Sequence, residues 1–131
     1  MTAWRALTKK HEFHEVYEHG AKKVGRLLVV YLLPADDMAR AVVASKKIGN
    51  AVKRNRGKRL LREAFRASFC GESDQIDHVM GLLKRLPRDS GSETGDPCAA
   101  KGLWVVLVAR RNILAATSRD VREELDHLLG H

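Results

Sequence analysis

The stretch ASKKIGNAVKRNRGKRLLREAFR, residues 44–66, concentrates the charge of this sequence in one place. It contains nine of the 24 Lys and Arg residues but only one, Glu63, of the 16 Asp and Glu residues. Because the formal net charge of the 131-residue chain is +8, everything outside this stretch is neutral in sum. A single basic cluster on an otherwise neutral protein indicates a polyanionic partner.

The same stretch predicts a long helix with two different faces. Asn50 is a favourable N-cap, and at about 100° per residue the pattern continues to about residue 69. The face predicted to pack in the core holds Gly57, Leu60, Leu61, Ala64, Phe65 and Ser68. The face predicted to meet water holds Asn55, Arg56, Arg59, Arg62 and Arg66, with Lys53, Arg54 and Lys58 at the N-terminal end or on the flanks.

The cationic face works against the stability of its own helix. Arg59, Arg62 and Arg66 are like charges three and four residues apart, and basic residues in the first turn oppose the helix dipole. A face that is only solvated normally mixes both signs, so a binding role is favoured. Among polyanions the residues favour RNA, because arginine grips phosphate and stacks on bases, and Asn50 and Asn55 suit sugar and base edges.

The segments before this helix predict one further helix and two strands. Residues 9–19 form a helix that Thr8 would cap and Gly20 would end, with Phe13, Val16 and Tyr17 on one face. The apolar run at 26–33 predicts a buried strand, and 40–45 a second strand that is a candidate hairpin partner of the first. A short strand within 21–25 is a weaker candidate.

The segments after the basic helix complete an α-β-β-α-(α)-β-α order. Residues 71–86 keep a helical spacing up to Pro87, and 87–102 is a loop rich in Gly, Ser and Pro. A strand at 103–109 precedes a last helix that Thr117 or Ser118 would cap. The buried stripe of that helix is Val121, Leu125, Leu128 and Leu129. The expected fold class is α+β: a small two-layer sandwich of one mainly antiparallel sheet with helices packed on it, as in ribosomal proteins.

Several sequence features bear on the function class. No apolar run is long enough to cross a membrane and no targeting signal is visible, so we expect a cytoplasmic protein. Cys70 and Cys98 predict ordinary thiols. HEFHE, residues 11–15, superficially resembles a zinc-binding pattern, but its second His is one residue too early. We therefore interpret these residues as surface polar groups, with no metal ligand and no catalytic residue in the protein.

At the basic helix the sequence resembles the protein component of bacterial ribonuclease P. SKKIGNAVKRNRGKRLLREAFR, residues 45–66, matches the signature of that family, whose centre is Arg54-Asn55-Arg56. LTKKHEFHEVYEHG resembles the family's first helix, GRLLVVY its strand and VVLVARR its last strand. The resemblance covers about 100 of the 131 residues.

The resemblance implies the small subunit of a ribonucleoprotein that removes the 5′ leader from precursor tRNA. The RNA subunit would be the catalyst, working through Mg²⁺ bound mainly by that RNA. Its partners would be the ribonuclease P RNA and precursor tRNA, with no membrane and no stable protein partner. The residues implied to bind RNA are Lys46, Lys47, Asn50, Lys53, Arg54, Asn55, Arg56, Lys58, Arg59, Arg62 and Arg66. The residues implied to line a cleft for the leader are Phe13, Tyr17, Val29 and Tyr31.

Some of these roles have competing explanations, and the chain departs from the family at three places. Phe13 is equally well explained as a core residue. Gly57 replaces an aliphatic residue, and Leu28 replaces a common aromatic, which predicts weaker leader stacking. The segment at 71–102 is longer than the family's usual link, and its Lys84, Arg85 and Arg88 are minor candidates for RNA contact.

We therefore expect a single RNA-binding domain over residues 1–131, with a flexible insert at about 87–102. An alternative function is a non-catalytic RNA chaperone or ribosome-associated RNA-binding protein, because small αβ domains serve many roles. A second alternative, a nuclease that uses His11 or His14 itself, would require the protein to cleave RNA alone.

Overall fold

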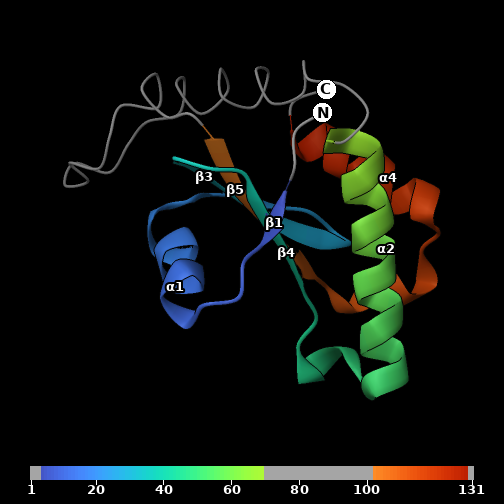
Figure 1. Cartoon of the computed structure of the whole chain (residues 1–131). Coiled ribbons are helices and arrows are strands. Elements are labelled where there is room, and N and C mark those ends of the chain that lie inside the picture. The colour runs from blue at the N-terminus through green and yellow to red at the C-terminus, as the bar shows by residue number, and fades with distance from the viewer. Residues whose placement is uncertain (1–3, 70–101, 130–131) are drawn as a thin grey trace.

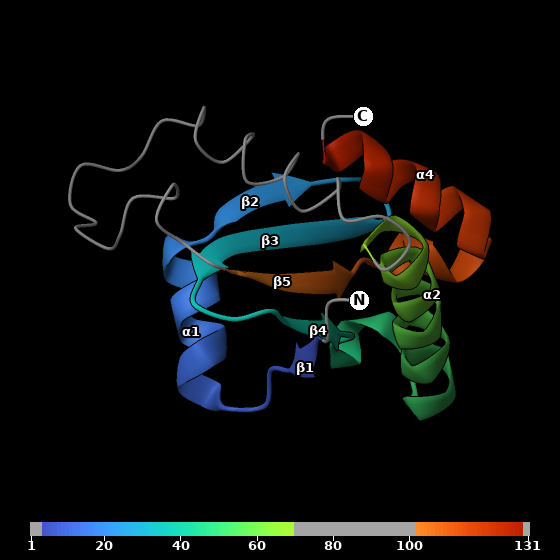
Figure 2. The same cartoon turned by 45° about the horizontal axis from the view of Figure 1, so that its top comes forward.

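The computed structural model describes residues 4–69 and 102–129, and its five strands form one sheet in the order β1-β4-β5-β3-β2. The strands are β1 Arg5–Ala6, β2 Ala21–Val24, β3 Leu28–Ala35, β4 Ala39–Val43 and β5 Gly102–Ala109. Figure 2 shows this order across the sheet. β3 runs antiparallel to β2 and β5, while β4 runs parallel to β5 and β1. The longest pairing, β3 with β5, is antiparallel, which confirms the expected α+β class.

The helices pack on the two faces of this sheet. α1 (Lys10–His19) lies on one side, and α2 (Ala51–Phe69) and α4 (Ser118–Leu128) lie on the other (Figure 1). Successive side chains of a strand point to opposite faces, so β3 sends Leu28, Val30 and Leu32 into the larger core under α2 and α4. Tyr31 and Leu33 face the smaller core under α1, whose buried centre includes Val16 and Val106.

One carboxylate of α4 holds the turn that precedes β3. Glu124 of α4 accepts hydrogen bonds from the backbone N–H groups of Arg26, Leu27 and Leu28, at 2.9, 2.6 and 3.1 Å. Arg26 and Leu27 therefore belong to a turn that Glu124 fixes. This explains why β3 begins at residue 28 rather than at the predicted residue 26.

The predicted hairpin between the strands at 26–33 and 40–45 is wrong. β5 lies between β3 and β4, and it pairs with β3 over Leu28–Ala35 and with β4 over Ala39–Val43. β5 is the most apolar strand of the chain, and the centre of a sheet is the position where both faces are covered. The weaker candidate at 21–25 is confirmed as β2, and β1 was not predicted.

Two predictions for the helices need correction. Thr8 does not cap α1: the N-cap is Lys9, whose backbone N–H donates to the carboxylate of Glu12 at 3.3 Å. Ser68 is only half-buried, and its hydroxyl donates to Asp126 of α4. The other predicted core residues of α2 are buried, as is Phe69.

Two predicted helix ends are confirmed, and the remaining predictions concern residues outside the described ranges. Gly20 follows the last residue of α1, and Thr117 caps α4 by accepting a hydrogen bond from the N–H of Asp120 at 3.2 Å. The expected helix at 71–86, nearly all of the loop at 87–102, Cys70, Cys98, Lys84, Arg85 and Arg88 fall outside the described residues.

Candidate nucleic-acid interface

The basic helix starts at a tight, well-capped turn at one end of the sheet. β4 leads into the short 3-10 helix η1 (Lys46–Ile48), and Gly49 follows with φ of 142°, a conformation that favours glycine. Asn50 then caps α2, since its side-chain oxygen accepts from the N–H of Lys53 at 3.0 Å. This turn fixes where the cationic face of α2 begins.

The structure places the predicted RNA-binding residues on one accessible surface, which we call the basic face. Its exposed members are Lys46, Lys47, Asn50, Lys53, Asn55, Arg56, Arg59, Arg62 and Arg66. Arg54 and Lys58 are half-buried on the flanks, and the Nε atom of Arg54 is buried without a hydrogen-bond partner among the described residues.

The basic face is poorly neutralised by the protein itself. Within the described chain its one ion pair joins Arg59 to Glu63, 3.3 Å apart and exposed to water. The outer face of α4 differs, because Arg119 pairs with Glu123 and Arg122 with Asp126. Because the other arginines of α2 have no acidic partner among residues 4–69 and 102–129, this face suits binding to the phosphates of a polyanion.

A second accessible surface lies on the opposite side of the sheet, where α1 meets β3. The rings of Tyr17 and Tyr31 meet edge to face with centroids 4.9 Å apart, and the Phe13 centroid lies 6.2 Å from that of Tyr17. Tyr17 is 42% exposed, and its partial burial, followed by the nearby Tyr31, raises the pKa of its hydroxyl. The Lys22 ammonium lies 5.8 Å from the centroid of Tyr31.

Beside these aromatic rings four valines cross the sheet in one line, which we call the valine row. Val24, Val29, Val108 and Val43 are consecutive cross-strand partners on β2, β3, β5 and β4. Val24 is 55% exposed and the other three are half-buried. An accessible apolar strip next to aromatic rings and a lysine is the composition of a platform for unpaired bases.

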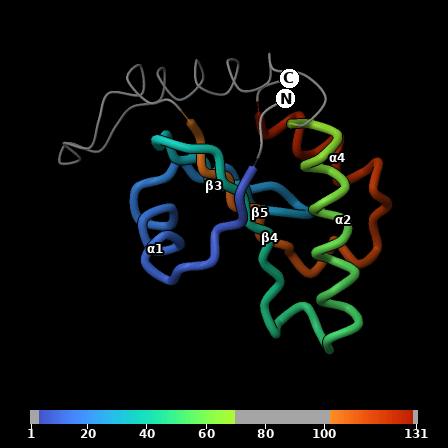
Figure 3. Tube along the Cα trace, viewed as in Figure 1, coloured from blue at the N-terminus to red at the C-terminus, as the bar shows by residue number. Residues whose placement is uncertain are grey.

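The two surfaces approach each other at one end of the sheet. Val43 ends both the valine row and β4, and Lys46 and Lys47 follow within four residues. The trace in Figure 3 runs from β4 through this turn directly into α2. One end of the valine row is therefore joined to the start of the basic face by a short stretch of chain.

The structure brings the four predicted cleft residues together and places Leu28 away from them. Phe13, Tyr17, Val29 and Tyr31 all lie at the face of the sheet that α1 covers. Phe13 packs on the smaller core, which confirms its role as a core residue, and it is only half-buried, so its contact with a leader stays a prediction. Leu28 is fully buried on the other face, so the prediction that it weakens stacking in the cleft is wrong.

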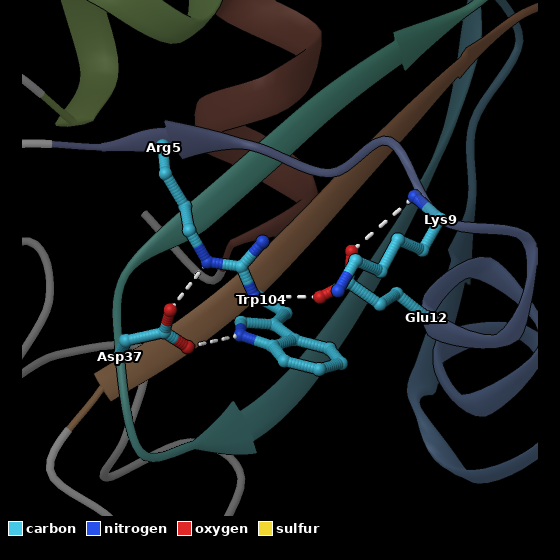
Figure 4. A network of polar contacts seen from close by, with 5 residues as sticks. All are labelled: Arg5, Lys9, Glu12, Asp37 and Trp104. Carbon is cyan, nitrogen blue, oxygen red and sulfur yellow. Dashed lines mark hydrogen bonds and ion pairs between the residues drawn. The ribbon is translucent and has the colours of Figure 1, made fainter.

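The prediction that Glu12 is a surface group is wrong. Glu12 belongs to a polar network that the sequence did not predict. Glu12 is a buried residue, 6% exposed, and not one of the surface groups of the HEFHE pattern. Arg5 Nη2 donates to its carboxylate at 2.7 Å, and Arg5 Nε donates to Asp37 (Figure 4). Asp37 also accepts from Trp104 Nε1 at 2.7 Å. No local sequence pattern connects these four residues, which come from separate segments.

In this network the positive charge of Arg5 stabilises the negative charges of Glu12 and Asp37, and they stabilise it in turn. Hydrogen bonds to Glu12 and then to Asp37 raise the pKa of Arg5, and the bond from Arg5 is the main cause that lowers the pKa of each acid. All three groups are therefore charged at neutral pH, and the inward-facing Glu12 is committed to Arg5.

Two kinds of structural feature are absent from the described part of the chain. No three His, Cys, Asp or Glu side chains gather there as a metal-binding group. No helix described is both long and apolar enough to span a lipid bilayer.

Comparison with known proteins gives consistent relatives. The family model described as ribonuclease P matches residues 1–86. The ribonuclease P protein component of an Exiguobacterium species is 48% identical over 124 residues, which cover 93% of this chain and 84% of that protein. The ribonuclease P protein component of Coprothermobacter proteolyticus is 42% identical over 85 residues, which cover 64% of this chain and 66% of that protein. The match to the ribonuclease P protein component of Clostridioides difficile covers 59% of that protein.

Solved structures share the fold. The RNase P protein of Staphylococcus aureus superimposes with a TM-score of 0.65 at 23% identity, over 97% of this chain and 94% of that one. The RNase P protein of Thermotoga maritima has a TM-score of 0.63 at 22% identity, over 95% and 94% of the two chains.

Proposed function

Because this chain belongs to the ribonuclease P protein family, we propose that it is the protein subunit of a ribonuclease P holoenzyme and assists removal of the 5′ leader from precursor tRNA. In this proposal the basic face binds the ribonuclease P RNA. The cleft formed by the aromatic rings and the valine row holds the single-stranded leader. The observation that carries the proposal is the presence of two accessible surfaces of different chemistry on opposite faces of one sheet.

Each surface suits the partner assigned to it. Exposed arginines in fixed helical positions suit the phosphates of a folded RNA, which binds through its backbone and shape. The rings of Tyr17 and Tyr31 and the apolar valine row suit unpaired bases, since stacking on aromatic side chains is worth about 1–3 kcal/mol per base. Lys22, beside Tyr31, adds a cation for the leader backbone.

The chemistry of cleavage is assigned to the RNA subunit in this proposal. Mg²⁺ held mainly by that RNA would supply the chemistry of hydrolysis, and no residue of this protein is assigned to hold it. The protein contributes by binding and orienting the leader, which raises the affinity for substrate, and by reducing repulsion between the two RNAs.

Reconstitution tests this function. Purified protein would be combined with a bacterial ribonuclease P RNA and a precursor tRNA at low Mg²⁺. We expect cleavage at the mature 5′ end only when protein and RNA are both present. Binding of RNA without stimulated cleavage would favour the alternative of a non-catalytic RNA chaperone. Cleavage by the protein alone, lost on substitution of His11 or His14, would show that the protein is itself a nuclease.

A further inference from the structure

The helix α1 carries half of the proposed leader cleft but has only a small core beneath it. Val16 is its one fully buried apolar residue, and the buried centre of this core is otherwise made of Leu7, Ala39, Ala41 and Val106. Larger side chains, among them Phe13, Tyr31 and Trp104, pack around this centre but are only partly buried, so polar contacts can also contribute to the tilt of α1. The position of Tyr17 over Tyr31 depends on that tilt.

A polar network fixes the N-terminal end of α1 to the sheet. Glu12 lies in the first turn of α1, and Arg5 is its ion-pair partner at 2.7 Å. Arg5 is itself held in place, because its backbone N–H donates to the carbonyl of Met38 at 3.0 Å, next to β4. The buried carboxylate can therefore adopt only positions that Arg5 reaches.

The other side of Arg5 is anchored to β5 and to the turn after β3. Its Nε donates to Asp37, and its guanidinium lies 5.4 Å from the ring centroid of Trp104, which donates to the same Asp37 (Figure 4). Gly102 at the start of β5 permits this approach, since a Cβ there would come within 2.2 Å of the carbonyl oxygen of Asp37. Arg5 thus bridges three separate segments with one planar group.

We propose that Arg5, acting through Glu12, is a positioning residue that sets the orientation of α1 and thereby the geometry of the leader cleft. Phe13 adjoins Glu12, and Tyr17 lies about one turn further along α1, so a change at Glu12 moves both rings against Tyr31. This inference rests on the proposed function, because it concerns how the cleft holds the leader. Arg5 and Glu12 should not affect the basic face, because it lies on the other side of the sheet.

The test compares the holoenzyme's affinity for precursor tRNA with its affinity for the same tRNA without a leader. The main variant is Arg5→Met with Glu12→Met, because replacing both charges by apolar side chains leaves no unpaired buried carboxylate. The matched control is Arg119→Met with Glu123→Met, which removes the 3.1 Å pair on α4. Thermal unfolding would first establish that each variant is folded at the assay temperature.

We expect the Arg5 and Glu12 variant to lose about fivefold or more of its preference for the leader-bearing substrate, because a misaligned ring loses part of its stacking on a base. Its affinity for the ribonuclease P RNA should stay within about twofold of the original, since α2 is on the opposite face and phosphate contacts carry that affinity. A purely structural loss would lower both affinities. The control variant should change neither.

A second variant is needed in case the variant with Arg5→Met and Glu12→Met does not fold. Asp37 is 47% exposed, and Asp37→Asn keeps an acceptor for Trp104 while removing the charge that holds Arg5. We expect a smaller loss of leader preference in the same direction. Unchanged leader preference in both folded variants overturns the inference.

If leader preference is unchanged in those variants, Tyr31→Ala shows whether the positioning role of Arg5 or the proposed leader cleft has failed. A loss of leader preference in Tyr31→Ala, with none in the Arg5 variants, overturns only the positioning role of Arg5. No loss in Tyr31→Ala overturns the leader cleft itself, and the inference with it.

Discussion

At the scale of single residues, Gly57 has room for a larger side chain. It is buried on the core face of α2, and a Cβ built there would lie 3.5 Å from Ala109 and 3.6 Å from Ile113, which are ordinary contact distances. A glycine inside a helix costs about 1 kcal/mol relative to alanine. We expect Gly57→Ala to raise the free energy of unfolding by about that amount, measured by urea denaturation. Ala67→Gly, exposed on the same helix, should lower it. A less stable Gly57→Ala protein would mean that Ala109 and Ile113 cannot accommodate the added methyl group.

Glu12 makes stability depend on pH. Its ion pair with Arg5 lowers the pKa of the folded carboxyl below the ordinary value of 4.5. The stabilisation is therefore present above that value and is lost as pH falls through the lower pKa of the folded state. We expect the stability difference between the unchanged protein and Glu12→Gln to shrink from about pH 6 to about pH 3 in urea denaturation. Glu15→Gln, exposed on the same helix, is the control for the loss of a carboxyl group from α1.

At the scale of elements, the cationic surface of α2 should control how binding depends on salt. Arg62 is exposed and has no acidic partner in the described ranges, so it is available to a phosphate. Replacing Arg62 or Arg59 with Ala should weaken binding to the ribonuclease P RNA and reduce the slope of log affinity against log salt by up to about one. Arg119→Ala, which removes an exposed arginine of α4 outside the basic face, is the control. An unchanged slope would mean that neither α2 arginine meets a phosphate.

The turn between β2 and β3 depends on α4. Glu124 satisfies three backbone N–H groups there, and Val24 and Val29 of the valine row flank this turn. Hydrogen bonds to a charged group contribute about 1.5–3 kcal/mol. We expect Glu124→Ala to lower the free energy of unfolding by an amount in that range, whereas Glu123→Ala on the exposed face should be nearly neutral. Equal effects of the two substitutions in thermal unfolding would contradict this role of Glu124.

At the scale of the whole molecule, the sheet separates the two surfaces. Because the aromatic rings and the basic face lie on opposite sides, their contributions to binding should be independent. Tyr31→Ala should weaken binding of precursor tRNA to the holoenzyme, and Arg62→Ala should weaken binding of the protein to the ribonuclease P RNA. The double variant should show the sum of the two free-energy changes. A clear departure from additivity in equilibrium binding would mean that one RNA segment spans both surfaces.

The sequence alone determined the features that depend on neighbouring residues. The buried and exposed faces of α2, the Asn50 cap and the strand nature of β3, β4 and β5 follow from local spacing and capping. The motif around Arg54-Asn55-Arg56 was enough to indicate the family, which the relatives confirm. The location of Arg56, Arg59, Arg62 and Arg66 on one side of α2 needed only the helical period.

Only the tertiary structure decided the features that join distant segments. β5 enters between β3 and β4 because the most apolar strand gains most from a position covered on both faces, and no local pattern specifies its partners. Glu12 has the same sequence appearance as the exposed His11 and Glu15, and its burial is compensated by the distant Arg5 together with the N–H of Lys9. The valine row likewise exists only through strand register. Spacing along the chain fixes the faces of each element, whereas the pairing of faces and charges is fixed by contacts between residues far apart in sequence.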